Sequence, residues 1–422
     1  MKRFLGTALG KTVLSLTKLR GTGGHALPGL VIERLIPKYL ASMLTQLPEG
    51  VVIITGTNGK TTTTKMVVEL LKFNGKRVLT NPTGSNYTRG IISSMARQAR
   101  VTGRLPFDIG VFELDEAYAK QFVALVKPRW VLALNVMRDQ LDRFGELDTA
   151  AKLIAQTMSE ATEGVIVNDN DWRLVQYAQK SGKDTMYFGV ADKLRHYFPG
   201  DDELVSVGAK PTPKPRAHQR VVELADFDGQ KVTYAMGGQK HKVELRITGQ
   251  HNFQNAAAAL ALAYTLLPQA QSRNLVQQLA SISPAFGRGQ SFKFKDGSKL
   301  ELILVKNPAG FRQALVSYPV TRKLVMFAIN DNYADSRDTS WLWDVDFSML
   351  KGQSVPLTSG ARAADMALRL SYDGVKVKQV EPNLTAALHG FANLHGDKLL
   401  ITTYTAMLKL HKMLVKQAGK TL

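Results

Sequence analysis

The chain contains no cysteine among its 422 residues. This absence excludes disulfide bonds, thiolate metal sites and cysteine nucleophiles in the protein. The sequence also lacks an internal repeat and any apolar run long enough to cross a bilayer. Acidic residues are few relative to basic ones, since 35 Asp and Glu stand against 55 Lys and Arg, which gives a formal net charge of +20.

A net charge of this size points to anionic partners. Nucleic acid is not expected, because the sequence has no recognisable nucleic-acid-binding module and no interleaving of aromatic with basic residues. An anionic membrane surface uses the same electrostatics. Apolar residues make up 44% of the chain and charged residues 21%, as in folded globular proteins, and the length suits two or three domains.

Basic residues gather near the N-terminus. Residues 1–40 contain seven Lys or Arg and one acid, Glu33, with apolar residues between them. Lys11 and Lys18 interrupt the apolar residues, so this region lacks the apolar core of a signal peptide. Residues 1–45 therefore form a basic N-terminal segment with two open interpretations: an amphipathic segment at a membrane surface, or a helix packed on the protein.

The most informative stretch, residues 51–64, joins an apolar strand to a glycine loop, a lysine and four threonines. Its glycines let backbone N–H groups face a polyphosphate, Lys60 can reach the terminal phosphates, and a threonine hydroxyl can bind magnesium. We predict an ATP site with an exposed loop lysine. Because the chain is expected to use ATP and shows no export signal, we also predict that it is cytoplasmic. The predicted nucleotide contacts in the loop are Gly56, Thr57, Asn58, Gly59, Lys60, Thr61 and Thr62.

Short apolar strands alternate with helical patterns, which predicts an α/β fold with parallel βαβ units in a doubly wound sheet. An active site is expected at the carboxyl ends of these strands. Residues 193–246 break the rhythm and contain two alternating, hairpin-like strands at 231–235 and 242–247. The expected parallel strands lie at 77–79, 109–112, 130–134 and 164–168, and those of a second, Rossmann-like domain at 300–305, 324–330 and 398–403.

Two residues separate the glycines of the loop, fewer than in the common G-x-x-x-x-G-K-[ST] motif. This shorter loop resembles that of the Mur ligase superfamily, which activates a carboxylate with ATP as an acyl phosphate. Further segments narrow the resemblance to the MurT family, the synthetase subunits that amidate lipid II. These segments are residues 80–90, 112–117, 134–146, 306–311, 330–335 and 341–347.

The resemblance implies a Mur ligase-type central domain, a P-loop ATPase with a parallel sheet, at 46–286. A C-terminal Mur ligase domain that contacts a glutaminase is expected at 287–422. MurT proteins typically carry a four-cysteine zinc ribbon in the central domain, which this sequence cannot build. We expect residues 193–246 to form in its place a small β subdomain held by packing and turns, with no zinc site.

The resemblance also implies an activity. ATP would phosphorylate the α-carboxylate of the D-glutamate in the lipid II stem peptide, and ammonia from a GatD-type glutaminase would convert the acyl phosphate to D-isoglutamine. One alternative is a stand-alone amino-acid ligase of the Mur or folylpolyglutamate type, which the 330–347 block argues against. Another is a non-catalytic scaffold that binds nucleotide.

Metal and nucleotide contacts follow from the same resemblance. Thr61 and Glu113 are expected to bind magnesium. Gln140 fills the position of a superfamily histidine that helps to hold a second metal, so the number of magnesium ions stays open. Asp139 and Asp142 either support this site or cap a helix.

Two further groups of residues are expected at the nucleotide. His251, Asn252 and Asn255 match a superfamily motif that contacts ATP, although side chains at the start of a helix also serve as caps. Arg288 lies in the expected hinge between the domains and resembles an arginine that moves onto the phosphates when the domains close.

An aspartate of the C-terminal domain is expected to act outside the ATP site. The family's glutaminase lacks an acidic member of its Cys-His site, and an aspartate of the MurT subunit is thought to supply it. We prefer Asp344 over Asp346 for this role, in which a carboxylate orients the histidine. The alternative is an ordinary capping acid.

The missing cysteines give a direct test. The purified chain should hold no stoichiometric structural zinc, and chelators should leave its melting temperature unchanged, because no thiolate site can form. Elemental analysis that finds one tightly held zinc per chain would contradict this prediction.

Overall fold

The protein divides into two compact units, which we describe separately. The first unit lies within Met1–Met137, Glu146–Arg246 and Asn252–Ile282, and the second mainly within Ser283–Leu422. The computed structural model describes residues 2–19, 27–81, 87–137, 147–200, 218–283, 288–294, 296–318, 320–335 and 337–418.

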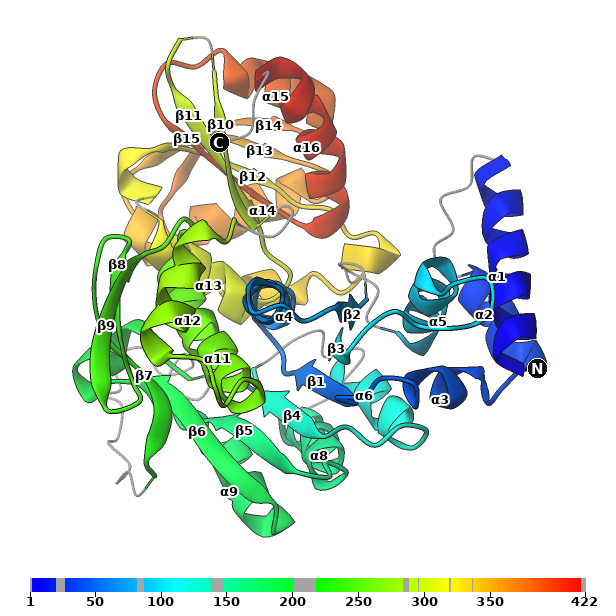
Figure 1. Ribbon diagram of the computed structural model, residues 1–422. Helices are drawn as coiled ribbons and strands as arrows, with labels where there is room; N and C mark the ends of the chain where they lie inside the picture. The colour runs from blue at the N-terminus through cyan, green and yellow to red at the C-terminus, as the bar shows by residue number, and fades with distance from the viewer. Residues whose placement is uncertain are drawn as a thin grey trace. The chain divides into compact units, whose positions relative to one another are not determined.

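The first unit is built on a sheet whose strands follow the order β2-β3-β1-β4-β5-β6-β7-β8-β9 (Figure 1). Pairing is parallel from β2 to β7, as the alternation of strands and helices predicts. Strands β8 and β9 extend the sheet in antiparallel pairing. The strands are β1 Val51–Thr55, β2 Val78–Thr80, β3 Ile109–Glu113, β4 Trp130–Ala133, β5 Gly164–Asn168, β6 Asp184–Val190, β7 Arg220–Asp228, β8 Lys231–Met236 and β9 Gln239–Glu244.

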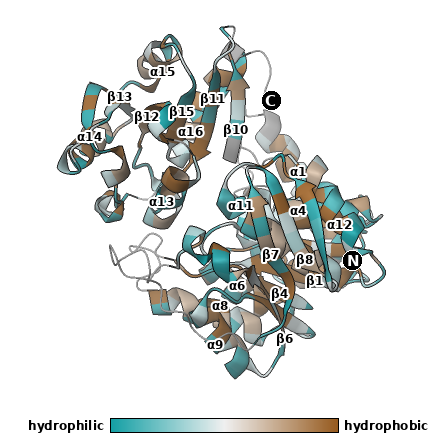
Figure 2. Cartoon of the chain, turned by 90° about the vertical axis from the view of Figure 1, so that its left-hand side faces the viewer, coloured by the Kyte–Doolittle hydropathy of each residue, from teal (hydrophilic) through white to brown (hydrophobic). Residues whose placement is uncertain are grey.

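Helices cover both faces of this sheet, so the central strands are buried on both sides and consist mainly of apolar residues (Figure 2). Helices α4, α11 and α12 lie on one face, and α6, α8 and α9 lie on the other (Figure 1). Helix α5 shares a core cluster with the second group. Their bounds are α4 Lys60–Phe73, α5 Thr88–Gln98, α6 Glu116–Val123, α8 Leu147–Ser159, α9 Trp172–Ser181, α11 Gln250–Leu266 and α12 Ser272–Gln278.

The basic N-terminal segment forms helices α1 Lys2–Leu19, α2 Leu27–Leu35 and α3 Tyr39–Leu44, which pack together and against α5. Thr7 and Tyr39 share a buried hydrogen bond of 2.9 Å between their hydroxyls. At Gly10, an added Cβ would lie 2.6 Å from the Cβ of Ala96, so only a residue without a side chain permits this approach. One face of α1 is therefore packed on the protein, which is the second of the two interpretations of this segment.

The segment at 193–246 differs from the expected separate subdomain in its connections. Strand β7 pairs in parallel with β6, so the β7–β9 strands continue the main sheet. The second predicted hairpin strand, 242–247, begins and ends earlier in the structure, at Gln239–Glu244. The sequence could not show this continuity, because strand pairing depends on contacts with residues far apart in the chain.

The second unit contains a six-stranded sheet with the order β10-β11-β15-β12-β13-β14 (Figure 1). Pairing is parallel except between β10 and β11. Separate apolar clusters cover its two faces. The elements are β10 Arg288–Lys293, β11 Lys299–Leu304, α13 Pro308–Ser317, β12 Leu324–Ala328, β13 Ser354–Ser359, α14 Ala363–Tyr372, β14 Lys376–Glu381, α15 Leu384–Ala392, β15 Lys398–Thr402 and α16 Tyr404–Ala418.

Each sheet ends on an edge strand with a pair of exposed lysines. Edge strand β9 carries Lys240 and Lys242, and edge strand β14 carries Lys376 and Lys378. Among the helices of the described residues, none is long and apolar enough to cross a membrane.

Asp171 connects the end of β4 to helix α9. One carboxylate oxygen accepts hydrogen bonds from the backbone N–H groups of Arg173 and Leu174, both at 3.2 Å, which caps the helix. The other accepts from the N–H of Val136, at 2.6 Å. Burial of the carboxyl group raises the pKa of Asp171 to about 6, although these backbone bonds act in the opposite direction.

This raised pKa predicts a pH dependence of stability. The folded state keeps a proton that the unfolded chain releases between about pH 4 and pH 6, so the contribution to stability is complete below about pH 4 and lost as the pH rises through about 6. The variant Asp171→Ser keeps a capping hydroxyl but does not titrate. Chemical denaturation should show that the wild type loses roughly 3 kcal/mol more than this variant between about pH 4 and pH 7. If the free energy of unfolding of the wild type instead rose with pH relative to that of Asp171→Ser, the raised pKa of Asp171 would be contradicted.

Candidate active site

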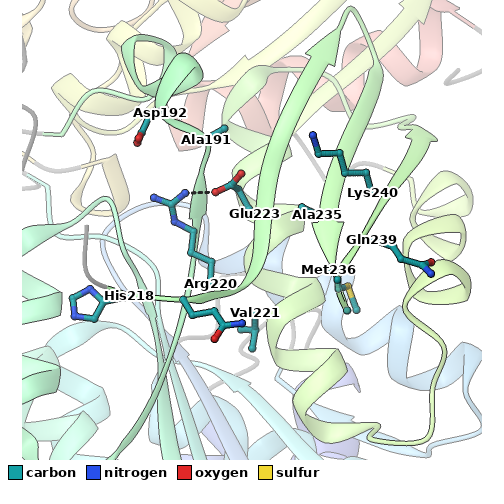
Figure 3. A pocket seen from close by; sticks show the side chains of 13 residues that line it. Ala191, Asp192, His218, Arg220, Val221, Glu223, Ala235, Met236, Gln239 and Lys240 are labelled. Carbon is teal, nitrogen blue, oxygen red and sulfur yellow. Dashed lines mark hydrogen bonds and ion pairs between the residues drawn. The ribbon is translucent and has the colours of Figure 1, made fainter. Parts of the chain in front are cut away.

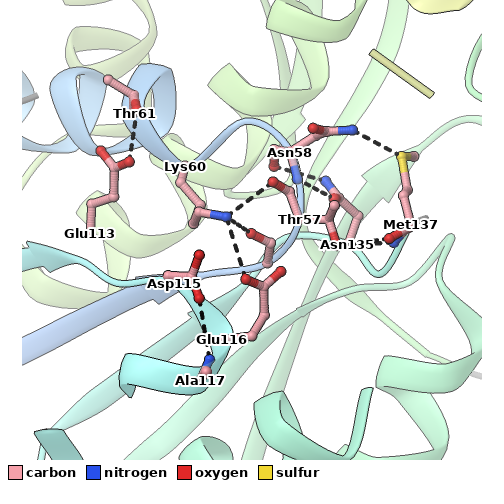
Figure 4. Close-up of polar contacts among 11 residues, drawn as sticks. Thr57, Asn58, Lys60, Thr61, Glu113, Asp115, Glu116, Ala117, Asn135 and Met137 are labelled. Carbon is pink, nitrogen blue, oxygen red and sulfur yellow. Dashed lines mark hydrogen bonds and ion pairs between the residues drawn. The ribbon is translucent and has the colours of Figure 1, made fainter. Parts of the chain in front are cut away.

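The loop between β1 and α4 carries the glycine-lysine-threonine motif (Figure 4). Gly59, the residue before the helix, has a φ of 86°, a conformation that other residues rarely adopt. A Cβ at this position would lie 2.2 Å from Oδ1 of Asn255 in α11. Glycine at 59 is therefore required both by the backbone conformation and by the close approach of α11.

Asn135, directly beyond β4, fixes the shape of the loop (Figure 4). Its Oδ1 accepts from the N–H of Asn58 at 2.8 Å, and its Nδ2 donates to the carbonyl of Asn58 at 3.1 Å. Its own carbonyl accepts from the N–H of Thr57 at 3.0 Å. Met137 adds a bond from its N–H to the Thr57 hydroxyl, at 3.0 Å. The loop is thus held by the chain segment beyond a neighbouring strand.

Lys60 is buried, with 5% of its surface exposed, so the prediction of an exposed loop lysine is wrong. Its Nζ donates to the carbonyl of Thr57 at 3.0 Å and to that of Gly56, and lies 3.7 Å from the carboxylate of Glu116. Two features bury it: the preceding loop turns its carbonyls back toward the side chain, and Glu116 approaches it from α6. A cation with three anionic or carbonyl partners therefore lies at the centre of the loop.

Thr61 and Glu113 are brought together across two elements (Figure 4). The Thr61 hydroxyl donates to Oε1 of Glu113 at 2.8 Å, and both residues are buried. The backbone of Glu113 is held in turn by the side chain of Asn81, which accepts from its N–H at 3.0 Å and donates to its carbonyl at 2.9 Å. Asn81 follows β2, so the strand next to β3 positions the glutamate.

The donor set fits a magnesium site. Magnesium prefers oxygen ligands and is usually held by one or two protein groups together with waters and phosphate oxygens. The hydroxyl of Thr61 and the carboxylate of Glu113 supply two such oxygens beside the loop. Within the described residues, no group of three or more His, Cys, Asp or Glu side chains could hold a metal by itself. The site therefore suits a metal that arrives with phosphates.

The two acids after Glu113 have different surroundings. Oδ1 of Asp115 accepts from the N–H of Ala117 at 3.4 Å, which makes this residue the N-cap of α6. Glu116 is 4% exposed and faces Lys60. Glu116 is therefore a buried counter-charge of Lys60.

The motif at the start of α11 is partly connected to the loop. Asn252 and Asn255 are buried, and Nδ2 of Asn255 donates to Oδ1 of Asn252 at 3.2 Å. Asn255 also lies against Gly59, as described above. His251 lies in the first turn of α11 and is half-buried.

Several predicted residues lie outside the described part of the chain. Gln140, Asp139 and Asp142 belong to the undescribed stretch 138–146. Arg288 begins strand β10, but its side chain is not among those described. Thr62 is buried in the first turn of α4, next to the Thr61–Glu113 pair.

In the second unit, Asp344 and Asp346 have different partners. Oδ1 of Asp346 accepts from the N–H of Ser348 at 2.8 Å, and this bond lowers the pKa of Asp346. Asp344 ends the 3-10 turn Ser340–Asp344 and is exposed, and Arg312 binds its backbone carbonyl. Among the described residues, its carboxylate has no hydrogen bond or ion pair. Asp346 is thus used as a turn cap, while the Asp344 carboxylate stays available.

The 330–335 segment is a local scaffold. Nδ2 of Asn330 donates to the hydroxyl of Thr405 at 2.9 Å, and its Oδ1 accepts from the N–H of Ala361 at 3.0 Å. The buried Asp335 accepts from the N–H of Thr405 at 2.7 Å. These bonds join the end of β12 to the start of α16, which explains the polar residues of this segment without assigning them to catalysis.

A cavity of about 590 Å³ lies on the β6–β9 side of the first unit (Figure 3). Its buried cation, Arg220, donates from Nε to Asp169 at 2.8 Å and from Nη1 to Glu223. Arg220 is therefore paired with two carboxylates, and none of the predicted site residues lines the cavity.

Sequence reasoning missed two positioning residues, Asn81 and Asn135, and it did not connect Glu116 with Lys60. Asn81 directly follows β2 and Asn135 lies two residues beyond β4; a polar residue just after a short apolar strand is the available signal for a side chain at the carboxyl ends of a parallel sheet. No local signal identifies Glu116 as the partner of Lys60, because the contact joins residues 56 positions apart.

Two family models match the chain. The Mur ligase middle domain matches residues 54–263, and the MurT ligase C-terminal domain matches residues 304–407. They cover the phosphate loop, its partners and the Asp344 region.

Relatives of known name align over nearly the whole chain. The MurT subunit of lipid II isoglutaminyl synthase (glutamine-hydrolyzing) from Streptococcus pneumoniae is 29% identical, over 99% of this chain and 98% of the relative. The subunit of the same name from Staphylococcus aureus (strain COL) is 28% identical, over 96% of each chain.

Solved structures share the fold at low identity. MurF from Acinetobacter baumannii has a TM-score of 0.67 with 17% identity, and the match covers 92% of this chain and 80% of that one. Folylpolyglutamate synthase from Mycobacterium tuberculosis has a TM-score of 0.60 with 13% identity, and the match covers 91% and 97% of the two chains. The predicted α/β, Mur ligase-type fold is thereby confirmed, and the chain belongs to the MurT family of the Mur ligase superfamily.

Proposed function

We propose that the chain is the ATP-dependent synthetase subunit of a lipid II isoglutaminyl synthase. A carboxylate oxygen of D-glutamate attacks the γ-phosphorus of ATP, and ADP leaves. The nitrogen of ammonia then attacks the carbonyl carbon, a C–N bond forms, and phosphate leaves with the oxygen. Activation is needed because a carboxylate is a poor electrophile at neutral pH, and the protein contributes positioning and neutralisation of charge.

The observation that carries the proposal is the buried group of Lys60, Thr61 and Glu113 at the phosphate loop, in a chain that aligns end to end with MurT subunits. Two solved structures of this fold, MurF from Thermotoga maritima and the folylpolyglutamate synthase, are complexes with ADP, which supports a nucleotide site in this chain. Both relatives are named as one subunit of a glutamine-hydrolyzing synthase. This supports a second, glutaminase subunit as the source of ammonia.

The residues of the loop have separate tasks in this proposal. Backbone N–H groups at the start of α4 bind phosphate oxygens, helped by the positive end of the helix. Lys60 exchanges its carbonyl partners for the terminal phosphates, while Glu116 limits where the ammonium group can lie. Thr61 and Glu113 would hold magnesium, which would supply neutralisation of the phosphate charge.

Asn255 and Asn252 extend the nucleotide site, because Asn255 lies against Gly59. His251 and Arg288 keep their proposed roles at the nucleotide, as does Gln140 at the metal. Asp344 serves the partner's active site. Its exposed carboxylate is free among the described residues to orient a histidine of another chain, whereas Asp346 caps a turn.

Replacement of Lys60 tests the phosphate-binding role of this residue. Replacement by methionine should lower ATP-dependent amidation by about 10² to 10³, the effect of removing one charge-stabilising donor. It should also destabilise the fold, because Glu116 loses its buried counter-charge. The double variant Lys60→Met/Glu116→Gln should regain most of the stability but none of the activity.

Glu116→Gln alone is the matched control and should retain more activity than either lysine variant. A stable double variant that amidates lipid II at the wild-type rate would refute the phosphate-binding role of Lys60. Binding of ATP without turnover or amidation in the wild-type complex would instead favour the non-catalytic nucleotide-binding scaffold, and incorporation of an amino acid would favour a stand-alone ligase.

Replacement of Asp344 and of Asp346 distinguishes the roles of these two residues. Asp344→Asn should reduce glutamine-driven amidation by about 10² or more, because the partner's histidine loses the carboxylate that orients it. Ammonium chloride bypasses glutamine hydrolysis, so ammonia-driven amidation by the same complex should persist. Asp346→Asn is the control and should keep both activities, at a small cost in stability from the weaker turn.

Loss of both activities in Asp344→Asn, with an intact complex, would place this residue in the synthetase site or the fold. Full glutamine-driven activity in that variant, with loss in Asp346→Asn, would transfer the role to Asp346.

A further inference from the structure

The N-terminal helices α1 and α2 expose several large apolar side chains. Large apolar side chains of α1 and α2 are between 46% and 66% exposed, and they account for every exposed large apolar side chain described within residues 2–44. We call this surface the N-terminal apolar face. It consists of Phe4, Leu5, Leu16, Leu27 and Leu35.

The orientation of this face is fixed by packing on the opposite side of the helix. Thr7 is buried and bonded to Tyr39, and Gly10 lies against Ala96. Leu5 and Leu16 are about three turns apart, so they lie along one stripe of α1, away from the packed side. The exposure of these side chains is therefore a stable property of the folded unit and not the result of a loosely attached helix.

The N-terminal segment that carries the face is basic. Residues 1–40 contain seven basic residues and one acid, Glu33. The carboxylate of Glu33 already forms an ion pair with Arg89, at 2.7 Å. Arg34 and Lys38, beside Leu35, are exposed. The described positive charge next to the apolar face is therefore that of Arg34 and Lys38, in a segment whose net charge is positive.

Apolar side chains framed by basic ones are the combination that binds an anionic bilayer. The apolar groups enter the boundary between headgroups and acyl chains, and the cations attract acidic headgroups. A second copy of the same face is disfavoured as the occupant, because the two positive frames would repel each other. No described helix can span the membrane, so the contact would be one of lying on the surface.

We propose that the N-terminal apolar face binds the surface of an anionic lipid bilayer and thereby places the first unit next to a lipid-anchored substrate. The placement of substrate rests on the proposed function, whereas the binding to lipid stands on the face alone. Packing of α1 and membrane contact are then not exclusive, because they use opposite sides of the helix.

Sedimentation with vesicles tests the binding. The wild-type chain should bind vesicles of phosphatidylcholine with phosphatidylglycerol at least about tenfold more tightly than vesicles of phosphatidylcholine alone, and salt should weaken this binding. The variant Phe4→Ser/Leu5→Ser/Leu16→Ser should lose about tenfold or more in affinity for the anionic vesicles. Circular dichroism and size-exclusion chromatography would confirm that it folds, as expected for exposed positions.

The control removes the same amount of exposed apolar surface elsewhere on the first unit. The variant Phe73→Ser/Val101→Ser/Leu125→Ser changes side chains that are 47%, 63% and 54% exposed and should bind vesicles like the wild type. Equal loss in both triple variants, or absence of wild-type binding to anionic vesicles, would overturn the proposal. A change in oligomeric state in the N-terminal variant, with no binding of vesicles by the wild type, would identify a second copy as the occupant.

Activity provides an independent readout. With its glutaminase partner, the N-terminal variant should amidate a water-soluble, short-chain analogue of lipid II at the wild-type rate and should be several-fold slower on lipid II in anionic vesicles. Loss on both substrates would assign these side chains to the fold or the active site and contradict a membrane role. A wild-type chain that binds vesicles but amidates neither substrate would refute the proposed function and leave the lipid contact standing.

Discussion

The side-chain amide of Asn135 pairs with both backbone polar groups of Asn58, and the shape of the phosphate loop depends on this pairing. The amide group accepts one hydrogen bond and donates one, as a backbone peptide group does when two strands pair. With the loop held in this way, the carbonyls of Gly56 and Thr57 point toward the side chain of Lys60. The chemistry of the site is thus set by backbone geometry that a neutral asparagine maintains.

The carboxyl edge of the sheet contributes two more supports of the same kind. Asn81 holds the backbone of Glu113, and Asp171 holds the N–H of Val136 beyond β4. In each case a short polar side chain at a strand end binds the backbone of a neighbouring segment. A parallel sheet leaves such groups unpaired at its edge, so these residues satisfy the backbone and position the functional side chains at the same time.

Much of this organisation could be predicted from the sequence. The apolar runs and the glycine motif located β1, the loop and α4, and the alternation of elements gave the parallel sheet, because these signals are local. The burial of Lys60 beside Glu116 was not predictable, since it depends on where α6 begins relative to the loop. The continuity of β7 with β6 was missed for a similar reason, because the undescribed residues 201–217 separate the two strands in sequence and only pairing joins them.

The lysine pairs on the two edge strands, Lys240 with Lys242 and Lys376 with Lys378, have a consequence for the behaviour of the protein in solution. An open sheet edge presents unpaired N–H and C=O groups to which another chain can add a strand. Lysines on such an edge would have to lose hydration and approach like charges before a second sheet could dock there. These four lysines therefore oppose edge-to-edge pairing between sheets of different molecules. Their replacement by apolar residues would favour aggregation without changing the ATP site.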